Sequence, residues 1–326
     1  MRDRLLFIVA VAAFIIAVPL VYYLMFERGL SVTEPKEIIP KATDGGAATE
    51  PVAKPDEPVS IVPSALSLTE TEGNVEIGRA GRDWQPAEIG TVLSSRDRIR
   101  TDPTARAVLA MPGVFSVELD SSSEFEVKSL TDTVSRFLLE DGMISAEVVD
   151  NPDKLFEVEA ADSLARTSGG SFKMSKNKQG LVALGTSRGT VEVQAAGKII
   201  QVRKGFLTRI AKGKPPQDPI KVPSNLFLKV RWPRKKEMSA RQLVLSGKTT
   251  SGSRVRVGGT VVIVDSKGRF RKVLALKEGA NRVQIEAYDV GGNRNIKISP
   301  KIVVDTRGDS FQIRTSPEMW EKNKKK

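Results

Sequence analysis

Residues 279–293 read GANRVQIEAYDVGGN, a pattern typical of a β-strand bounded by two turns. Apolar and polar residues alternate from Arg282 to Tyr288, as they do when successive side chains point to opposite faces of a pleated strand. Gly279-Ala-Asn281 predicts a turn before the strand, and Asp289-Val-Gly-Gly-Asn293 predicts another after it. The stretch therefore predicts β-structure in the C-terminal part of the chain.

Short runs of the same kind continue on both sides of this stretch. Seven fall within residues 225–305, with Asp265-Ser-Lys-Gly268 as a hairpin turn, and this is the size and strand count of an immunoglobulin-like sandwich. More runs, separated by glycine-containing breaks, fill residues 64–211. They predict a second all-β domain there, and the pattern leaves open whether it is a sandwich or a short β-solenoid.

Proline-rich segments divide the chain. Residues 212–224 contain four prolines and predict a linker between the two domains. Residues 27–63 contain six prolines and show no helical or strand period, so they predict an extended spacer. Residues 306–326 form a basic tail that ends in Lys324–Lys326.

Leu5–Phe26 is an uncharged apolar run, preceded by Arg2 and Arg4. As a helix it would be about 33 Å long, enough to span the hydrocarbon core of a bilayer. The alternative is a cleaved signal peptide, but such peptides have shorter apolar cores and an Ala-x-Ala-like site, which does not follow here. We therefore expect a single helix at 5–26 in the inner (cytoplasmic) membrane, residues 1–4 in the cytoplasm and the β domains outside it.

The composition restricts the possible chemistry. The chain has no cysteine and no histidine, which excludes a Ser-His-Asp triad, thiolate catalysis and the usual zinc ligands. Asp97, Asp120 and Asp162 are available carboxylates, but nothing in their spacing indicates a glycosidase pair. The sequence also has no Walker motif, no dinucleotide-binding glycine motif and no Asp-x-Asp-x-Asp calcium loop. We expect no enzyme activity, no catalytic residues, no cofactor and no metal site.

The net charge of +12 is unevenly distributed, because 31 Lys and Arg stand against 10 Asp and Glu after residue 197. A basic half suggests contact with a polyanion, although it also fits a lysine-decorated soluble surface. Six residues that cluster along two or three predicted strands are candidates for binding an anionic ligand: Arg254, Arg256, Lys267, Arg269, Arg271 and Lys272. The period of two puts Arg254 with Arg256 on one face, and Lys267, Arg269 and Arg271 on one face. The alternative is a charged edge that prevents aggregation between strands.

The region from about Ser67 to Gly213 resembles the FecR domain family. The resemblance is carried by short motifs in order: Gly73-Asn-Val75, Trp84-x-Pro86-Ala87-x-x-Gly90-x-Val-Leu93, Asp97-x-Ile99-x-Thr101, Ala105-Arg106-Ala107-x-Leu109, Leu139-x-x-Gly142, Phe156-x-Val158, Gly170-Ser171-Phe172, Gly189-x-Val191-x-Val193 and Gly205. It departs from the family pattern at Arg96-Asp97 and at Gly170-Ser171. The resemblance implies an all-β domain, in which Trp84 is either a core residue or a ligand contact.

Residues 226–304 resemble bacterial Ig-like domains through Gly247-x-Thr249, Val255-x-Val257, Asp265-x-x-Gly268-x-Phe270, Leu276-x-x-Gly279-x-Asn281 and Ala287-x-Asp289-x-x-Gly-Asn293. Such domains commonly act as spacers or adhesion modules. The FecR resemblance implies a relation to sigma-factor regulators, whose cytoplasmic segment of many tens of residues contacts the sigma factor. Only Met1–Arg4 precede the apolar run, so we do not expect direct anti-sigma activity.

The leading hypothesis is a membrane-anchored envelope scaffold. Its partners would be the membrane and either an envelope protein or an anionic polysaccharide or lipid. The alternative is a transmembrane signalling component related to FecR-type regulators. Nucleic acid is not expected, because the predicted anchor places the basic residues outside the cytoplasm.

Overall fold

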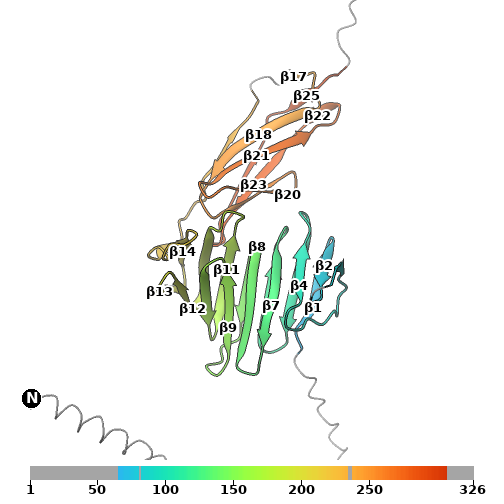
Figure 1. Cartoon of the computed structure of the whole chain (residues 1–326). Coiled ribbons are helices and arrows are strands. Elements are labelled where there is room, and N and C mark those ends of the chain that lie inside the picture. Colours follow the sequence, from blue (N-terminus) through green and yellow to red (C-terminus); the bar gives the residue numbers. More distant parts are fainter. Residues whose placement is uncertain (1–64, 81, 234–236, 307–326) are drawn as a thin grey trace, which may run out of the picture. The chain divides into compact units, whose positions relative to one another are not determined.

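The computed structural model of the chain describes residues 65–80, 82–233 and 237–306. The predicted membrane helix at 5–26, the spacer at 27–63 and the tail beyond Thr306 lie outside these residues. A search of the described ranges finds no helix with the length and apolar character needed to cross a bilayer. Every regular element in these ranges is a β-strand, which confirms the predicted all-β class (Figure 1).

The first group of strands, blue to olive in Figure 1, is hydrogen-bonded into one continuous sheet. Its members are β1 (Ser67–Glu72), β2 (Val75–Gly78), β3 (Trp84–Pro86), β4 (Arg98–Thr101), β5 (Arg106–Met111), β6 (Phe115–Leu119), β7 (Glu124–Leu130), β8 (Val134–Val148), β9 (Leu155–Ala160), β10 (Ser163–Thr167), β11 (Gly170–Lys176), β12 (Val182–Ala195), β13 (Lys198–Arg203), β14 (Phe206–Ile210) and β15 (Ile220–Lys221).

Two long strands fold this sheet onto itself. The first half of β8 pairs with β7 and β9, and its second half pairs with β6 and β11. β12 changes partners in the same way, from β11 and β14 to β10 and β13. Gly142 lies where β8 changes partners: its φ is 105°, and an added Cβ would lie 2.5 Å from the Cα of Ser123. Both the backbone angle and the close approach require glycine there.

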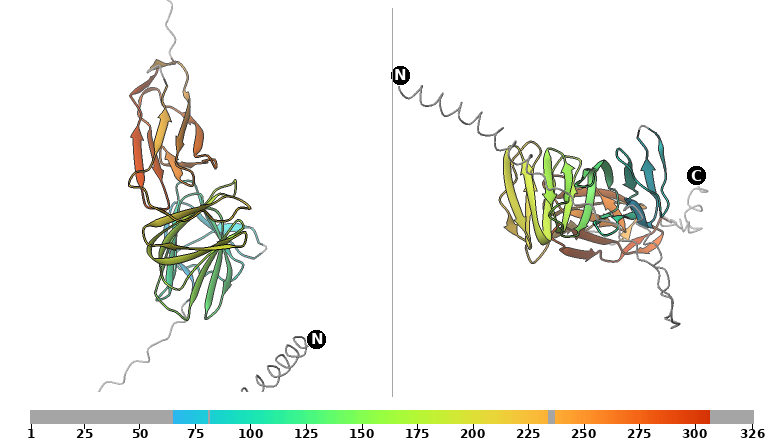
Figure 2. Two further views of the ribbon diagram at one scale, coloured as in Figure 1. Left: turned by 90° about the vertical axis from the view of Figure 1, so that its left-hand side faces the viewer. Right: turned by 90° about the horizontal axis from the view of Figure 1, so that it is seen from below.

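The two layers enclose a single apolar core. Phe115, from one layer, has its ring centroid 5.5 Å from Phe137 and 5.0 Å from Phe156, both from the other layer. Phe125 and Phe172 extend this row of rings at 5.1 and 6.1 Å. Strand pairing in this group is antiparallel except between β8 and β9. Stacked coils would need parallel pairing throughout, so the pairing favours packed layers over a solenoid (Figure 2).

The second group, orange to red in Figure 1, has its own core, which includes Leu245, Val255, Ile285 and Ala287. It forms three small sheets, with the strand orders β16-β18-β21, β17-β25-β22 and β20-β19-β23-β24. Its members are β16 (Leu228–Arg231), β17 (Glu237–Met238), β18 (Gln242–Thr249), β19 (Arg254–Val257), β20 (Thr260–Val262), β21 (Arg269–Ala275), β22 (Gly279–Asn281), β23 (Gln284–Tyr288), β24 (Arg294–Ile298) and β25 (Ile302–Val304).

The segment at 212–224, predicted to be a linker, connects the two groups and contains the short strand β15. Ile220 lies opposite Leu207 of β14, so this part of the segment belongs to the first sheet. Val222 then packs close to Gly291 of the second group. The proline content predicts a connection at this point, but it does not predict that the connection itself packs against both groups.

Candidate functional site

Asp120 follows strand β6 and starts a loop of three serines, Ser121–Ser123. Neighbouring strands fix this loop. The N–H of Ser123 donates to Oγ1 of Thr101 (3.0 Å), which itself donates to the carbonyl of Asp120 (2.7 Å). The Ser123 hydroxyl donates to the carbonyl of Met143 (3.2 Å). The loop therefore holds the Asp120 carboxylate and its own carbonyl groups in a defined position.

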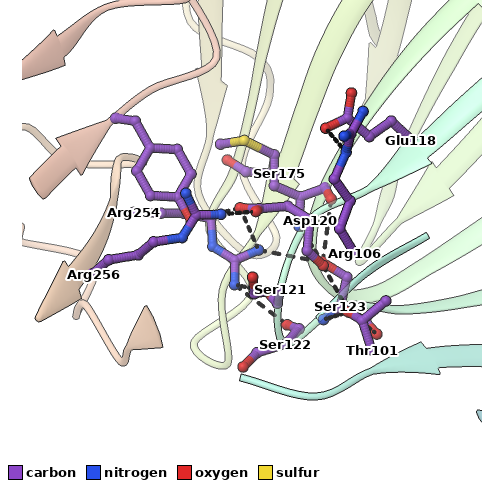
Figure 3. Close-up of polar contacts among 12 residues, drawn as sticks. Thr101, Arg106, Glu118, Asp120, Ser121, Ser122, Ser123, Ser175, Arg254 and Arg256 are labelled. Carbon is purple, nitrogen blue, oxygen red and sulfur yellow. Dashed lines mark hydrogen bonds and ion pairs between the residues drawn. The ribbon is translucent and has the colours of Figure 1, made fainter. Parts of the chain in front are cut away.

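Three side chains of the second group converge on this loop, and Figure 3 shows both arginines pointing toward Asp120. Arg256 donates to Oδ1 of Asp120, and the Tyr288 hydroxyl donates to Oδ2 at 2.5 Å. Nη1 of Arg254 lies 3.8 Å from Oδ2, and its Nη2 donates to the carbonyl of Ser121 at 2.6 Å. Arg254 lies directly opposite Tyr288 in the β19–β23 pair, so the pleat puts all three side chains on one face.

Burial makes these contacts strong. The side chains of Asp120, Arg254 and Arg256 are only 15%, 11% and 28% exposed. Burial first, and then the charge of Asp120, raise the pKa of Tyr288 far above its ordinary value, against the opposing effect of Arg254. Tyr288 therefore stays protonated and acts as a donor. The guanidinium of Arg256 also lies 4.6 Å from the centre of the Tyr288 ring, a favourable cation–π distance.

An apolar contact lies beside this polar cluster. Met143, Ala183 and Leu207 of the first group pack with Val290 of the second group. Gly185 of β12 allows the closest approach, since an added Cβ would lie 2.5 Å from the carbonyl oxygen of Val290. We call the whole contact, made by the Asp120 cluster and this apolar patch, the junction.

A cleft of about 380 Å³ lies beside the junction and is lined by both groups of strands. Its wall combines apolar side chains, such as Val261 and Ile263, with charged ones, such as Lys176 and Asp141. Burial raises the pKa of Asp141, while the charge of Arg254 opposes the shift. The buried hydroxyl of Ser253, also on this wall, has no hydrogen-bond partner among the described residues. Within those residues, no group of three or more acidic side chains is placed to hold a metal ion.

The structure divides the six basic candidates into different sites. Arg254 and Arg256 enter the junction. Arg269 and Arg271 lie exposed on β21, in a different sheet, and Arg269 pairs with Asp265 at 2.7 Å. The remaining two candidates are Lys267, exposed in the turn before β21, and Lys272, on the opposite face of β21 from Arg271.

Trp84 is half-buried on β3. Its ring packs over Gly78, where an added Cβ would lie 3.3 Å away. The guanidinium groups of Arg98 and Arg100 stack on the ring at 4.9 and 4.3 Å from its centre. The ring therefore already has two cationic partners from its own chain, and Arg100 is itself held by Glu76 at 2.6 Å.

The roles of Asp120, Tyr288 and Gly185 were not found from the sequence. Asp120 is one of several carboxylates with uninformative spacing, and the sequence places Tyr288 only on a predicted strand. Gly185 offered a signal, because a glycine inside a strand often marks the close approach of another backbone. Nothing in the sequence said which backbone approaches it.

Comparisons with known proteins give one family match. The family model described as "FecR protein" matches residues 97–192. A search of curated proteins finds no matching sequence.

Two solved structures are similar to parts of the chain. One is a proposed anti-sigma factor from Parabacteroides distasonis ATCC 8503, with 17% identity, a TM-score of 0.34, and coverage of 37% of this chain and 59% of that one. The other contains fibronectin(III)-like modules of Clostridium thermocellum CbhA, with 19% identity, a TM-score of 0.23, and coverage of 57% and 96%. Both TM-scores lie under 0.5, so neither likeness carries weight for arrangement or function.

Proposed function

Because residues 97–192 form a FecR domain, we propose that this chain is a non-catalytic interaction scaffold of the cell envelope. In this proposal the FecR domain and the Ig-like domain that follows it act as one joined body. A helix at 5–26 anchors that body to the inner membrane, and the spacer at 27–63 holds it away from the bilayer on the extracytoplasmic side. The body presents a binding surface to an envelope polymer or protein.

The observation that carries the proposal is the junction. A carboxylate shared by two arginines and a tyrosine, all largely buried, is a geometry that fixes two bodies against one another. Gly185 and Val290 add a backbone contact that leaves no room for a side chain. Spacer domains on a flexible tether would not need such a contact.

The lack of histidine and cysteine supports a non-catalytic role, because it removes the commonest acid–base and nucleophilic side chains. Two charged side chains of the cleft already have ion pairs with described residues, Glu124 with Arg98 at 3.7 Å and Lys176 with Glu140 at 3.5 Å.

A second candidate is a membrane signalling component related to FecR-type regulators. The family match favours it, and a stiff body would suit it, since a displacement at one domain reaches the other. Deleting the gene and measuring genome-wide transcription separates the two: a single sigma-dependent set of genes should respond only for the signalling component.

The joined body is tested by a distance measurement on the full chain, which is convenient because no native cysteine competes for labelling. Spin labels at Asp132→Cys and Lys277→Cys, both exposed, report on the two domains. We expect one narrow distance distribution in double electron–electron resonance. A broad distribution would show that the domains move independently and would refute the joined scaffold.

The extracytoplasmic placement needs a separate test. A reporter that is active only outside the cytoplasm, fused after Lys326, should be active in cells. Activity of a cytoplasm-only reporter at that position would overturn the proposed topology.

A further inference from the structure

The outer face of the β16-β18-β21 sheet carries a row of three cations. Lys229 of β16 lies directly opposite Lys248 of β18, and Lys248 lies directly opposite Arg269 of β21. All three side chains are exposed. Neighbouring strands are about 4.8 Å apart, so three positive charges follow one another at that spacing.

A second row lies two residues away along the strands, about 6.7 Å from the first. It consists of Arg231, Ser246 and Arg271, again directly opposite one another. Beyond it, Val244 faces Val273, and these side chains are 50% and 54% exposed. We call Lys229, Arg231, Lys248, Arg269 and Arg271 the basic face.

The FecR domain arranges the charges on its outer face differently. On the outer face of its sheet, Arg166 lies between Glu192 and Glu157, with N–O distances of 3.5 and 3.9 Å. Arg136 continues the alternation and pairs with Glu157 at 2.6 Å. Opposite charges facing one another across strands stabilise a sheet, whereas like charges destabilise it. On the basic face, like charges lie opposite one another, and this lowers the stability of the folded state.

Protection of sheet edges does not account for this cost. Charged residues on edge strands prevent aggregation, and β16 and β21 are the edges of this sheet. Lys248, however, lies on the central strand β18. The three strands contain no Asp or Glu, and of the basic face only Arg269 has an ion pair with a described residue, to Asp265.

We propose that the basic face binds an extended acidic polysaccharide that carries a carboxylate on successive sugars. The cation spacing within the first row is close to the length of one sugar ring in an extended chain. Arginine and lysine both pair with carboxylates, and arginine does so in a two-pronged geometry. The Ser246 hydroxyl between two arginines suits a sugar hydroxyl, and Val244 and Val273 offer contacts for the apolar C–H faces of the rings.

The inference deepens the proposed function by naming the class of partner, and it rests on that function for the access of the face to envelope polymers. Its test uses purified full-length chain in neutral detergent. Failure of this test would leave the distance measurement and the topology test untouched, so the two ideas fail separately.

The experiment measures binding of polygalacturonate at low salt by the wild type and by a variant with Lys229→Gln, Lys248→Gln and Arg271→Gln. These three residues have no ion pair with a described residue, so their loss breaks no such pair. We expect affinity to fall on the order of tenfold or more, with a shallower dependence on salt, because fewer counterions are released. A charge-matched control with Arg282→Gln, Lys297→Gln and Lys301→Gln, also exposed, should keep wild-type affinity.

The melting temperature is a second readout, and it distinguishes a binding surface from surface charges that have no ligand. The basic-face variant should melt at a higher temperature than the wild type, because the repulsion within the row is relieved, while it binds less well. Equal loss of binding in the control variant would reduce the effect to net charge. Binding to vesicles of anionic phospholipid that equals or exceeds binding to polygalacturonate would assign the face to a lipid surface instead. Either result, or no binding of the polymer, overturns the proposal.

Discussion

Two Arg-x-Arg pairs of the second domain have the same local sequence pattern but lie in opposite environments. Arg254-Val-Arg256 and Arg269-Phe-Arg271 each place two arginines on one face of a strand, with a buried apolar residue between them. The first pair is largely buried against Asp120 of the FecR domain, whereas the second is exposed beside other cations. Alternation determines which side chains share a face, and the rest of the fold determines what that face meets.

The difference separates two uses of charge. In the junction, each arginine has a carboxylate or carbonyl partner, and the group contributes to holding two domains together. On the basic face, Lys229, Lys248 and Arg269 lie opposite one another, and only Arg269 has an ion pair with a described residue. Four experiments test whether this division is real, from the largest expected effect to the smallest.

Asp120→Ala should cause the largest loss. It leaves Arg256 and the Tyr288 hydroxyl without their acceptor in a largely buried place, and such a loss costs about 3 kcal/mol of unfolding free energy. Urea denaturation of the full chain measures it. The control is Asp218→Ala, which removes an ion pair with Lys198. The Asp218 side chain is 86% exposed, so no measurable change in stability is expected. Equal stability of Asp120→Ala and wild type would mean that the junction does not form in solution.

Gly185→Ala tests the apolar part of the junction. Gly185 does not have a left-handed backbone angle, so alanine suits the strand itself, but its Cβ would lie 2.5 Å from a backbone oxygen of Val290. The overlap should cost about 2 kcal/mol and broaden the label distance between Asp132→Cys and Lys277→Cys. Gly78→Ala is the matched control, because it presses only on the Trp84 ring within the first group of strands. An unchanged distance distribution in Gly185→Ala would contradict the close contact.

Arg256→Gln and Arg271→Gln compare the two pairs directly. Removing Arg256 abolishes an ion pair with Asp120 and a stacking contact with Tyr288, and should cost about 1–2 kcal/mol. Removing Arg271 breaks no ion pair with a described residue and should change stability by less than about 0.5 kcal/mol. Thermal and urea unfolding of the two variants side by side measures the contrast. Equal losses would show that the two arginine pairs are not used differently.

The sequence predicted much of the local structure and little of what joins the parts. The strand at Arg254–Val257 and the shared face of Arg254 and Arg256 followed from alternation, because that pattern is local. The partner Asp120 lies 136 positions from Arg256, and no local signal connects them. The cation row likewise requires the strand order β16-β18-β21, since Lys229 and Arg269 are neighbours only through β18.

Asp141→Asn should have the smallest effect on stability of the changes described here. Asp141 lies in the wall of the cleft beside the junction. Burial raises the pKa of Asp141 above its ordinary value of 3.8, and this outweighs the attraction of Arg254 and of Lys178 and Lys176. The folded state therefore binds the proton more tightly than the unfolded state does. Stability from this group is present below about pH 4 and is lost as pH rises through the raised pKa.

The expected result is that Asp141→Asn matches the wild type near pH 3 and exceeds its stability at pH 7. Subtracting the two denaturation profiles at each pH removes the contribution of every other carboxylate. A variant that is less stable than the wild type at pH 7 would reverse the interpretation. The Asp141 charge would then be held by Arg254 as firmly as that of Asp120 is, and the junction would extend into the cleft.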